Sequence, residues 1–145
     1  MLKLLNAGQI RLADKYTIEN ESLSSSELME RAAQAFVKVF VERFPDKKSH
    51  ITICAGKGNN GGDGLAIARL LLAERYVNVH TIIADFSDKK SSDFEYNLAL
   101  LQQLDADIFY INDVSELELL QNDIIIDALF GSGLSRPLEN EWARL

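Results

Sequence analysis

Residues 50–75 read HITICAGKGNNGGDGLAIARLLLAER, and this stretch decides the fold. A β-rich run at 50–55 is followed by the glycine stretch, which we define as residues 56–64, and then by a helical pattern at 65–75. Five of the nine residues in the glycine stretch are glycine, although the whole chain has only eight. A strand, a glycine-rich connection and a helix in this order predict the start of a βαβ unit.

The remainder of the chain alternates in the same way. β-rich runs recur at 77–84, 107–111 and 123–127, and helical patterns separate them at 93–104 and 114–120. We therefore predict an α/β fold with a mostly parallel sheet, whose continuous apolar strands are covered by helices on both faces.

Two helical patterns precede the first strand. The first covers residues 6–20; the second begins after Ser24, which has capping-box spacing to Glu27, and ends at Pro45. We expect these helices to pack on the sheet or to form a subunit interface. A last helical pattern starts after Pro137.

Composition limits the classes of function. The chain has 145 residues, 47% of them hydrophobic and 26% charged, as in a single soluble globular domain. Its net charge of −7 argues against a nucleic acid or an anionic membrane as a partner. Because Cys54 is the only cysteine, we expect neither a disulfide within the chain nor a cysteine-based metal cluster, and a reducing cytoplasm fits. No apolar run approaches the roughly 18 residues that a transmembrane helix needs.

The glycine stretch is longer than a connection from strand to helix requires, which indicates a ligand site. Glycine lets backbone N–H groups come close to a ligand and lets the chain adopt positive φ. Gly56, Gly58 and Gly61 fit G-x-G-x-x-G, and Asp85 follows the second strand where a ribose-binding carboxylate would lie. An NAD-dependent dehydrogenase is therefore an alternative.

Three side chains of the glycine stretch count against that alternative. Asn59 and Asn60 place bulky amides between the glycines, and Asp63 places a carboxylate at the expected helix start. A carboxylate there caps a helix well but is a poor neighbour for a pyrophosphate.

A second informative segment follows the last β-rich run. Asp127 ends that run, and residues 128–137 read ALFGSGLSRP. An acid at the carboxyl end of a buried strand points into the crevice of a parallel sheet, where it needs a cation, a metal or hydrogen-bond donors. Backbone N–H groups of Gly131, Ser132 and Gly133, together with Arg136, are candidates for phosphate binding.

The segments GNNGGDGLAIAR (58–69), DALFGSGLSRP (127–137) and LMERA (28–32) resemble the NAD(P)H-hydrate epimerase family, also called the YjeF N-terminal domain. The resemblance covers nearly the whole chain. It implies a Rossmann-like three-layer αβα fold with two extra N-terminal helices and a homodimer. It also implies an isomerase that interconverts the R and S forms of hydrated NADH and NADPH with potassium in the site.

The resemblance also implies roles for individual residues. Asp127 would be the catalytic acid/base group, and Asn60 and Asp127 would be potassium ligands. The implied substrate-binding residues are Asn59, Asn60, Gly61, Gly62, Asp63, Gly131, Ser132, Gly133, Leu134, Ser135, Arg136 and Pro137.

One departure from the family pattern concerns the end of the chain. The family continues into another strand with a DIPSG-like motif that supplies a further potassium ligand, and nothing in residues 1–145 matches it. We therefore expect a single domain that is incomplete at its C-terminal end, with an incomplete potassium site. It would stand alone or precede an ATP- or ADP-dependent dehydratase in a bifunctional chain. A non-catalytic scaffold of the same fold is the remaining alternative, although such a protein would be expected to lose Asn60, Asp63 and Asp127.

Overall fold

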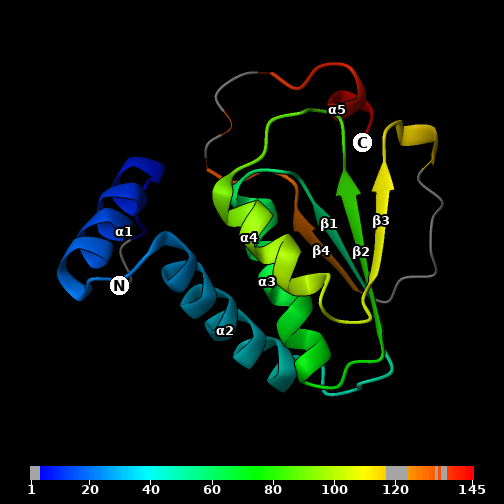
Figure 1. The fold of residues 1–145 in the computed structure, drawn as a ribbon, viewed down its shortest axis with the longest axis horizontal. Coiled ribbons are helices and arrows are strands. Elements are labelled where there is room, and N and C mark those ends of the chain that lie inside the picture. Colours follow the sequence, from blue (N-terminus) through cyan, green and yellow to red (C-terminus); the bar gives the residue numbers. More distant parts are fainter. Residues whose placement is uncertain (1–3, 117–123, 133, 135–136) are drawn as a thin grey trace.

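Four parallel strands form the sheet at the centre of the molecule. The computed structural model describes residues 4–116, 124–132, 134 and 137–145. Within this part, the strand order is β3-β2-β1-β4 (Figure 1). The strands are β1 (His50–Ala55), β2 (Asn78–Ala84), β3 (Asp107–Ile111) and β4 (Ile124–Ala128). The α/β class and the parallel pairing predicted from the sequence are confirmed.

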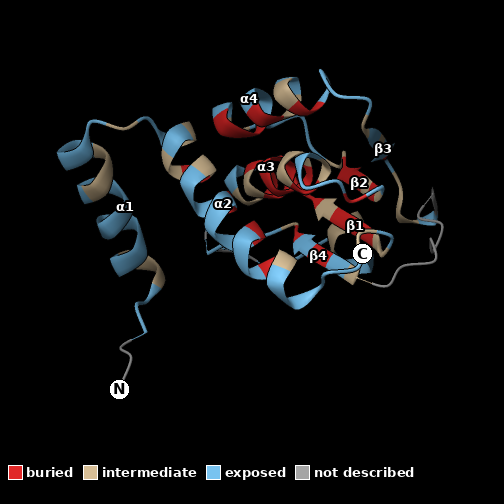
Figure 2. Ribbon diagram, turned by 90° about the horizontal axis from the view of Figure 1, so that it is seen from below, coloured by how far each residue is buried: buried red, intermediate tan, exposed pale blue. Residues whose placement is uncertain are grey.

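Three helices cover one face of this sheet. The central one, α3 (Asn59–Ala73), packs on β1, β2 and β4, and it lies between α2 (Ser25–Arg43) and α4 (Ser92–Leu101) (Figures 1 and 2). Strand residues that face α3 are buried, as Ile53 and its register partner Ile126 illustrate. On the opposite face Phe109 and Ile125 stay exposed, because the described helices that pack on the sheet all lie on the α3 side.

Helix α2 begins where the capping box predicted it. The Ser24 hydroxyl accepts a hydrogen bond from the Glu27 backbone N–H (3.2 Å), and the Glu27 carboxylate accepts one from the Ser24 N–H (2.7 Å). Hydrogen bonds that the Ser24 backbone N–H and the Ser24 hydroxyl (2.8 Å) donate to the Glu27 carboxylate lower the pKa of that carboxyl. Met29, Ala33, Val37 and Phe40 of its apolar stripe are buried, and the helix ends before Pro45. A capped amphipathic helix is therefore one of the elements that the sequence specifies locally.

A buried carboxylate joins α2 to α4. Asp93, in the first turn of α4, accepts hydrogen bonds from the hydroxyls of Ser25 (2.6 Å) and Ser26 (3.0 Å). Asn97 is also buried and donates to the Asp93 backbone carbonyl (2.9 Å). Hydrogen bonds to a charged group inside a protein are strong, so this cluster fixes the two helix N-termini beside each other.

Helix α1 (Ala7–Glu21) differs from the other long helices in burying none of its residues. It is capped by Asn6 and Gln9, but Leu12 and Tyr16 are 69% and 68% exposed. Figure 2 shows α1 projecting away from the sheet, with its residues coloured as exposed or intermediate. Of the two arrangements expected for the N-terminal helices, packing near the sheet therefore applies to α2 and not to α1.

In the described residues, the helical elements that follow β3 and β4 are short. A 3₁₀ turn spans Val114–Glu116, and residues 117–120 of the predicted helix lie outside the described part of the chain. The last helix, α5 (Glu141–Arg144), lies at the end of the sheet where the strand arrowheads point (Figure 1).

Candidate functional site

The candidate site lies at the carboxyl ends of β1 and β4. Strand β1 ends at Ala55, and α3 begins at Asn59 rather than at the predicted Leu65. The connection is therefore only residues 56–58, so the length that we took as a sign of a ligand site is an ordinary short turn. Most of the glycine stretch is the first two turns of a helix.

Close packing explains why these positions are glycine. A Cβ atom added to Gly61 would lie 1.7 Å from the Gly56 carbonyl oxygen, and one added to Gly56 would lie 2.4 Å from the Leu129 oxygen. A Cβ on Gly64 would lie 2.6 Å from the Ala128 Cβ. The expectation of positive φ is wrong for the glycines that the structure describes, none of which has positive φ. The glycines instead allow α3 to approach β1 and β4 closely.

Asp63 does not cap α3, which corrects the prediction that it lies at the helix start. The N-cap is Gly58, which makes no side-chain cap, and Asp63 lies in the second turn. Its side chain is half-buried. Burial, with the nearby carboxylates Asp93 and Asp14 adding to it, raises the pKa of Asp63 to about 6. Asp63 is therefore a carboxyl that takes up a proton close to neutral pH.

One pocket brings the two informative segments together. It has a volume of about 270 Å³ and lies between α2, the start of α3 and β4. Its polar lining residues are Asn60, Asp63 and Asp127. The segments also touch directly, because a Cβ added to Gly131 would lie 3.3 Å from the Asn60 Cβ. The segments that follow β1 and β4 thus lie beside each other.

Asp127 is exposed, whereas we predicted a buried carboxylate. Its Oδ1 accepts a hydrogen bond from the Leu129 backbone N–H (3.0 Å), so the carboxylate closes the turn that follows β4. Asp127 is the register partner of Cys54 on β1. Burial raises the pKa of the Cys54 thiol, and the negative charge of Asp127 raises it further. Ile126 and Ala128, on either side of Asp127, face α3 and are buried, so the Asp127 carboxylate borders the pocket from its solvent-exposed edge rather than from its interior.

The remaining predicted residues divide into three groups. Gly61 and Gly62 are buried and serve packing, with a Cβ on Gly62 placed 3.1 Å from the Met29 sulfur, while Asn59 is exposed in the first turn of α3. The exposed members of the segment after β4 are Gly131, Ser132, Leu134 and Pro137, and Gly133, Ser135 and Arg136 lie outside the described residues.

The structure argues against the dehydrogenase alternative at Asp85. Asp85 forms an ion pair with Lys57, whose side chain is only 6% exposed. Lys57 is part of the glycine stretch, and its backbone carbonyl also accepts a hydrogen bond from Ser91 (2.9 Å). A carboxylate held by a buried lysine is poorly placed to bind a ribose, because leaving the lysine unpaired costs several kcal/mol, on the order of 3–5.

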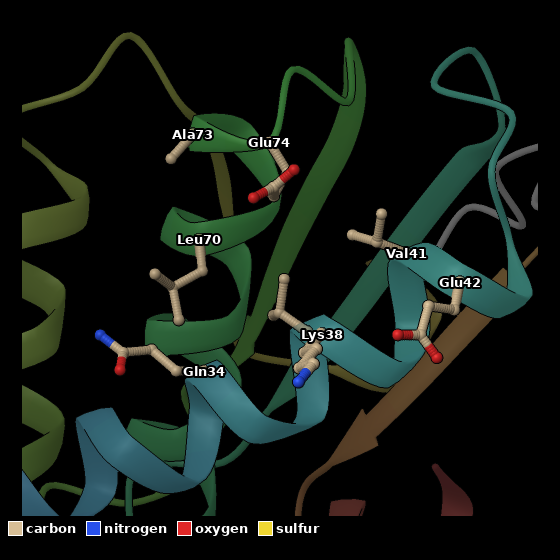
Figure 3. A pocket seen from close by; sticks show the side chains of 8 residues that line it. Gln34, Lys38, Val41, Glu42, Leu70, Ala73 and Glu74 are labelled. Atoms are coloured by element: carbon tan, nitrogen blue, oxygen red, sulfur yellow. The ribbon is translucent and has the colours of Figure 1, made fainter.

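Two other hollows lie outside this site. The one in Figure 3 has a volume of about 410 Å³ and lies between α2 and the last turns of α3, with Val41 and Leu70 among its lining residues. A groove between α2, α3 and α4 contains the ion pair of Arg69 with Glu30. Neither involves the carboxyl ends of the strands, where open α/β sheets bind ligands.

Sequence patterns did not identify the α2 wall of the pocket. Ala32, Ala33 and Phe36 line it from α2. Their helical spacing signalled a core face, but nothing in the sequence showed that part of that face borders a pocket.

The described residues contain neither a recognisable metal site nor a membrane-spanning helix. No group of three or more His, Cys, Asp or Glu side chains there has the arrangement of a metal site. None of the helices in that part of the chain has both the length and the hydropathy needed to cross a membrane.

Comparison with known proteins identifies a family to which the chain is similar. The family model described as YjeF-related protein N-terminus matches residues 25–145. The chain is 40% identical over 141 residues to the NAD(P)H-hydrate epimerase of Limosilactobacillus fermentum, covering 96% of this chain and 64% of that protein. It is 35% identical over 142 residues to the NAD(P)H-hydrate epimerase of Limosilactobacillus reuteri, covering 97% and 64%.

A longer relative and a solved structure complete the comparison. The chain is 37% identical over 145 residues to the bifunctional NAD(P)H-hydrate repair enzyme Nnr of Salinibacter ruber, covering 91% of this chain and 27% of that protein. The crystal structure of the yeast protein ynu0 has the same fold, with a TM-score of 0.80 and 24% identity over 99% of this chain and 63% of that chain. The chain thus spans less than two thirds of the length of each.

Proposed function

The chain belongs to the family of YjeF-related protein N-termini, and from this premise we propose that it interconverts the R and S forms of hydrated NADH and NADPH. Relatives named NAD(P)H-hydrate epimerase match 96% and 97% of the chain. The observation that carries the proposal is the pocket of about 270 Å³ that Asn60, Asp63 and Asp127 line together.

The reaction suits a pocket with carboxylates. Inverting a carbon that carries a hydroxyl group next to a ring nitrogen requires no net oxidation or reduction. The nitrogen lone pair expels the protonated hydroxyl as water, the ring becomes a flat cation, and water adds to the opposite face and loses a proton. One group must protonate the leaving hydroxyl and one must accept the proton of the incoming water, and positioned carboxylates perform both tasks in enzymes.

We assign the acid/base role to Asp127. Its carboxylate is oriented by the Leu129 N–H (3.0 Å) and remains exposed, so a substrate can reach it. The remaining residues would bind the nucleotide. The first N–H groups of α3, at Asn59 to Gly61, have no partner within the helix and favour an anion. The segment Gly131–Pro137 would receive the phosphates and the ribose. A hydrogen bond from the Leu134 N–H to the Gly131 carbonyl (3.4 Å) closes a turn in it.

The donor set of the pocket fits potassium. An amide oxygen from Asn60 and carboxylate oxygen from Asp127 are ligands that a hard cation prefers. When bound, potassium would supply positive charge that orders these two side chains around the substrate.

Partners and location complete the proposal. Exposed apolar side chains on α1 and α2, among them Leu12, Tyr16 and Val39, support a homodimer through the N-terminal helices. The Salinibacter relative is named as bifunctional, which supports a dehydratase that acts together with this chain or is fused to it. The single cysteine supports a reducing cytoplasm.

The proposal is tested with the pure R epimer of hydrated NADPH and the full-length protein. Chromatography follows the R-to-S ratio in KCl and in choline chloride. We expect fast epimerisation in KCl, and Asp127→Asn should lower kcat by about 10²-fold or more, since general acid/base groups contribute that much.

The matched control is Asp105→Asn, an exposed aspartate in the turn before β3. It should leave turnover unchanged. Epimerisation at the spontaneous rate in wild-type protein would exclude the proposed function, and full turnover in Asp127→Asn would exclude the role of Asp127.

A further inference from the structure

An aromatic cluster lies over the carboxyl ends of the strands, and we define it as Phe86, Phe130 and Trp142. The Trp142 ring lies 4.9 Å from the Phe86 ring and 4.8 Å from the Phe130 ring, at interplanar angles of 70° and 61°. Edge-to-face contacts of this kind are favourable, at about 0.5–1.5 kcal/mol each beyond the burial of area. Because Phe86 follows β2 and Phe130 follows β4, one indole ring on α5 bridges two separate loops.

Polar contacts fasten α5 to a third loop. The Glu141 carboxylate accepts a hydrogen bond from the Val114 N–H (2.9 Å), directly after β3. Arg144 contacts the carboxylates of Glu141 (2.6 Å) and Asp113 (3.9 Å). Figure 1 shows α5 beside the ends of β2 and β3. Helix α5 therefore connects the segments that follow β2, β3 and β4.

The contact of Trp142 with Phe130 lies next to the candidate site. Phe130 immediately precedes Gly131, where an added Cβ atom would lie 3.3 Å from the Cβ of Asn60, a residue that lines the pocket. Phe130 and Gly131 are otherwise exposed, and the preceding turn is closed by the hydrogen bond that the Leu129 backbone N–H donates to the Asp127 carboxylate. A shift of the Phe130 ring would consequently move Gly131 relative to Asn60.

The cluster is separate from the hydrophobic core. None of its three rings is a member of the buried core that α3 forms with the sheet. Loss of the Trp142 contacts should therefore change the segment after β4 without unfolding the sheet, and this distinguishes the cluster from ordinary core packing.

We propose that Trp142 is a positioning residue: through Phe130 it holds Gly131 and Ser132 in the conformation that receives the phosphates of the nucleotide. This inference rests on the proposed function for its ligand. Trp142 itself touches no reacting atom in this proposal.

The test uses Trp142→Ala and Trp142→Phe in the full-length protein. Without any ligand, hydrogen exchange of the amides of residues 129–132 should be about tenfold faster in Trp142→Ala, while the amides of α3 keep their wild-type rates. The dissociation constant of NADP⁺, measured by calorimetry, should rise about tenfold. In turnover, KM should rise in proportion while kcat stays within about twofold of wild type. Trp142→Phe keeps an aromatic ring and should restore most of each value.

Each outcome decides the inference. Unchanged exchange at 129–132 in Trp142→Ala would overturn it, as would faster exchange throughout α3, which would make Trp142 a general structural residue. If Trp142→Ala fails to fold, Phe86→Leu breaks the far contact of the bridge and should produce the same changes at smaller size, with unchanged exchange again overturning the inference. Wild-type protein that neither binds NADP⁺ nor epimerises would contradict the proposed function, and the ligand-free exchange still decides whether Trp142 holds this segment.

Discussion

The two glycine-bearing segments that meet at the pocket use glycine for different reasons. In the segment after β1, added Cβ atoms at Gly56, Gly61 and Gly64 would fall within 2.6 Å of other atoms. In the segment after β4, a Cβ at Gly131 would lie at 3.3 Å from its nearest neighbour, a distance that a small shift relieves. The first segment is fixed by packing, whereas the described residues of the second from Gly131 to Pro137 are exposed. A binding site of this kind therefore has one rigid wall and one adjustable wall.

The largest effect on stability should come from Gly61→Ala, because this substitution adds a methyl group within the rigid wall. Its methyl group would lie 1.7 Å from a backbone oxygen, so no side-chain movement can relieve the contact. Overpacking commonly costs about 1–3 kcal/mol, and a backbone clash should exceed this range. We expect the melting temperature to fall by roughly 10 °C or more, or the protein not to fold.

Gly58→Ser is the control for Gly61→Ala. A Cβ at Gly58 meets nothing within 4 Å. Its φ of −93° suits any residue, and serine is a good N-cap. The melting temperature should stay the same or rise slightly. Equal losses in the two variants would show that glycine in this segment does not serve packing.

An intermediate effect is expected for Asp63→Asn, and it should depend on pH. Because the pKa of Asp63 is raised from 3.8 to about 6 in the folded protein, its contribution to stability is fully present below pH 3.8 and is lost as the pH rises through 6. Asparagine does not titrate, so Asp63→Asn should raise the melting temperature above pH 7, with the gain shrinking between pH 6 and pH 4. We expect about 1 kcal/mol above pH 7, after discounting for solvent screening of this half-buried group.

Thermal melts of Asp63→Asn and wild type across pH 4 to 8 measure this gain, and Asp105→Asn again serves as the exposed control. A pH-independent difference would show that Asp63 titrates as an ordinary exposed carboxyl. The rigid wall would then contain no buried charge.

The smallest effect on stability should come from Gly131→Ala, in the adjustable wall. We expect a change in melting temperature of about 2 °C or less, because the clearance to Asn60 is close to ordinary contact. The dissociation constant of NADP⁺ should rise severalfold, since the methyl group lies where the two walls meet. Thermal melts measure the change in stability, and calorimetry measures the change in the dissociation constant. A loss of stability as large as that of Gly61→Ala would show that the two walls do not differ in rigidity.

Local sequence patterns predicted the parts of the fold that depend on neighbouring residues. Strands β1 and β3 have the predicted bounds, and the Ser24–Glu27 capping box starts α2. The start of α3 was missed because glycine has a low helix propensity, which the close approach to β1 and β4 overrides. Whether packing outweighs low helix propensity depends on tertiary contacts, which cannot be read from the local sequence.

The candidate site was predicted in its placement but not in its details. Parallel topology was enough to place Asn60 and Asp127 at one edge. The exposure of Asp127 depends on which face of β4 is covered, and the ion pair of Lys57 with Asp85 joins residues from different turns. The bridging role of Trp142 could not be predicted either, because it lies in a helix of only four residues and contacts rings far away in the chain.

The lack of buried residues in α1 affects how well this helix tolerates amino-acid substitutions. Since none of its residues is buried, substitutions along Ala7–Glu21 hardly alter the free energy of unfolding of the sheet and its core, apart from their effect on the helix itself. Selection for folding of this chain alone would therefore let positions such as Leu12 and Tyr16 drift toward polar residues. The homodimer proposed through the N-terminal helices would keep these positions apolar, and mutational tolerance along α1 measures how strong that demand is.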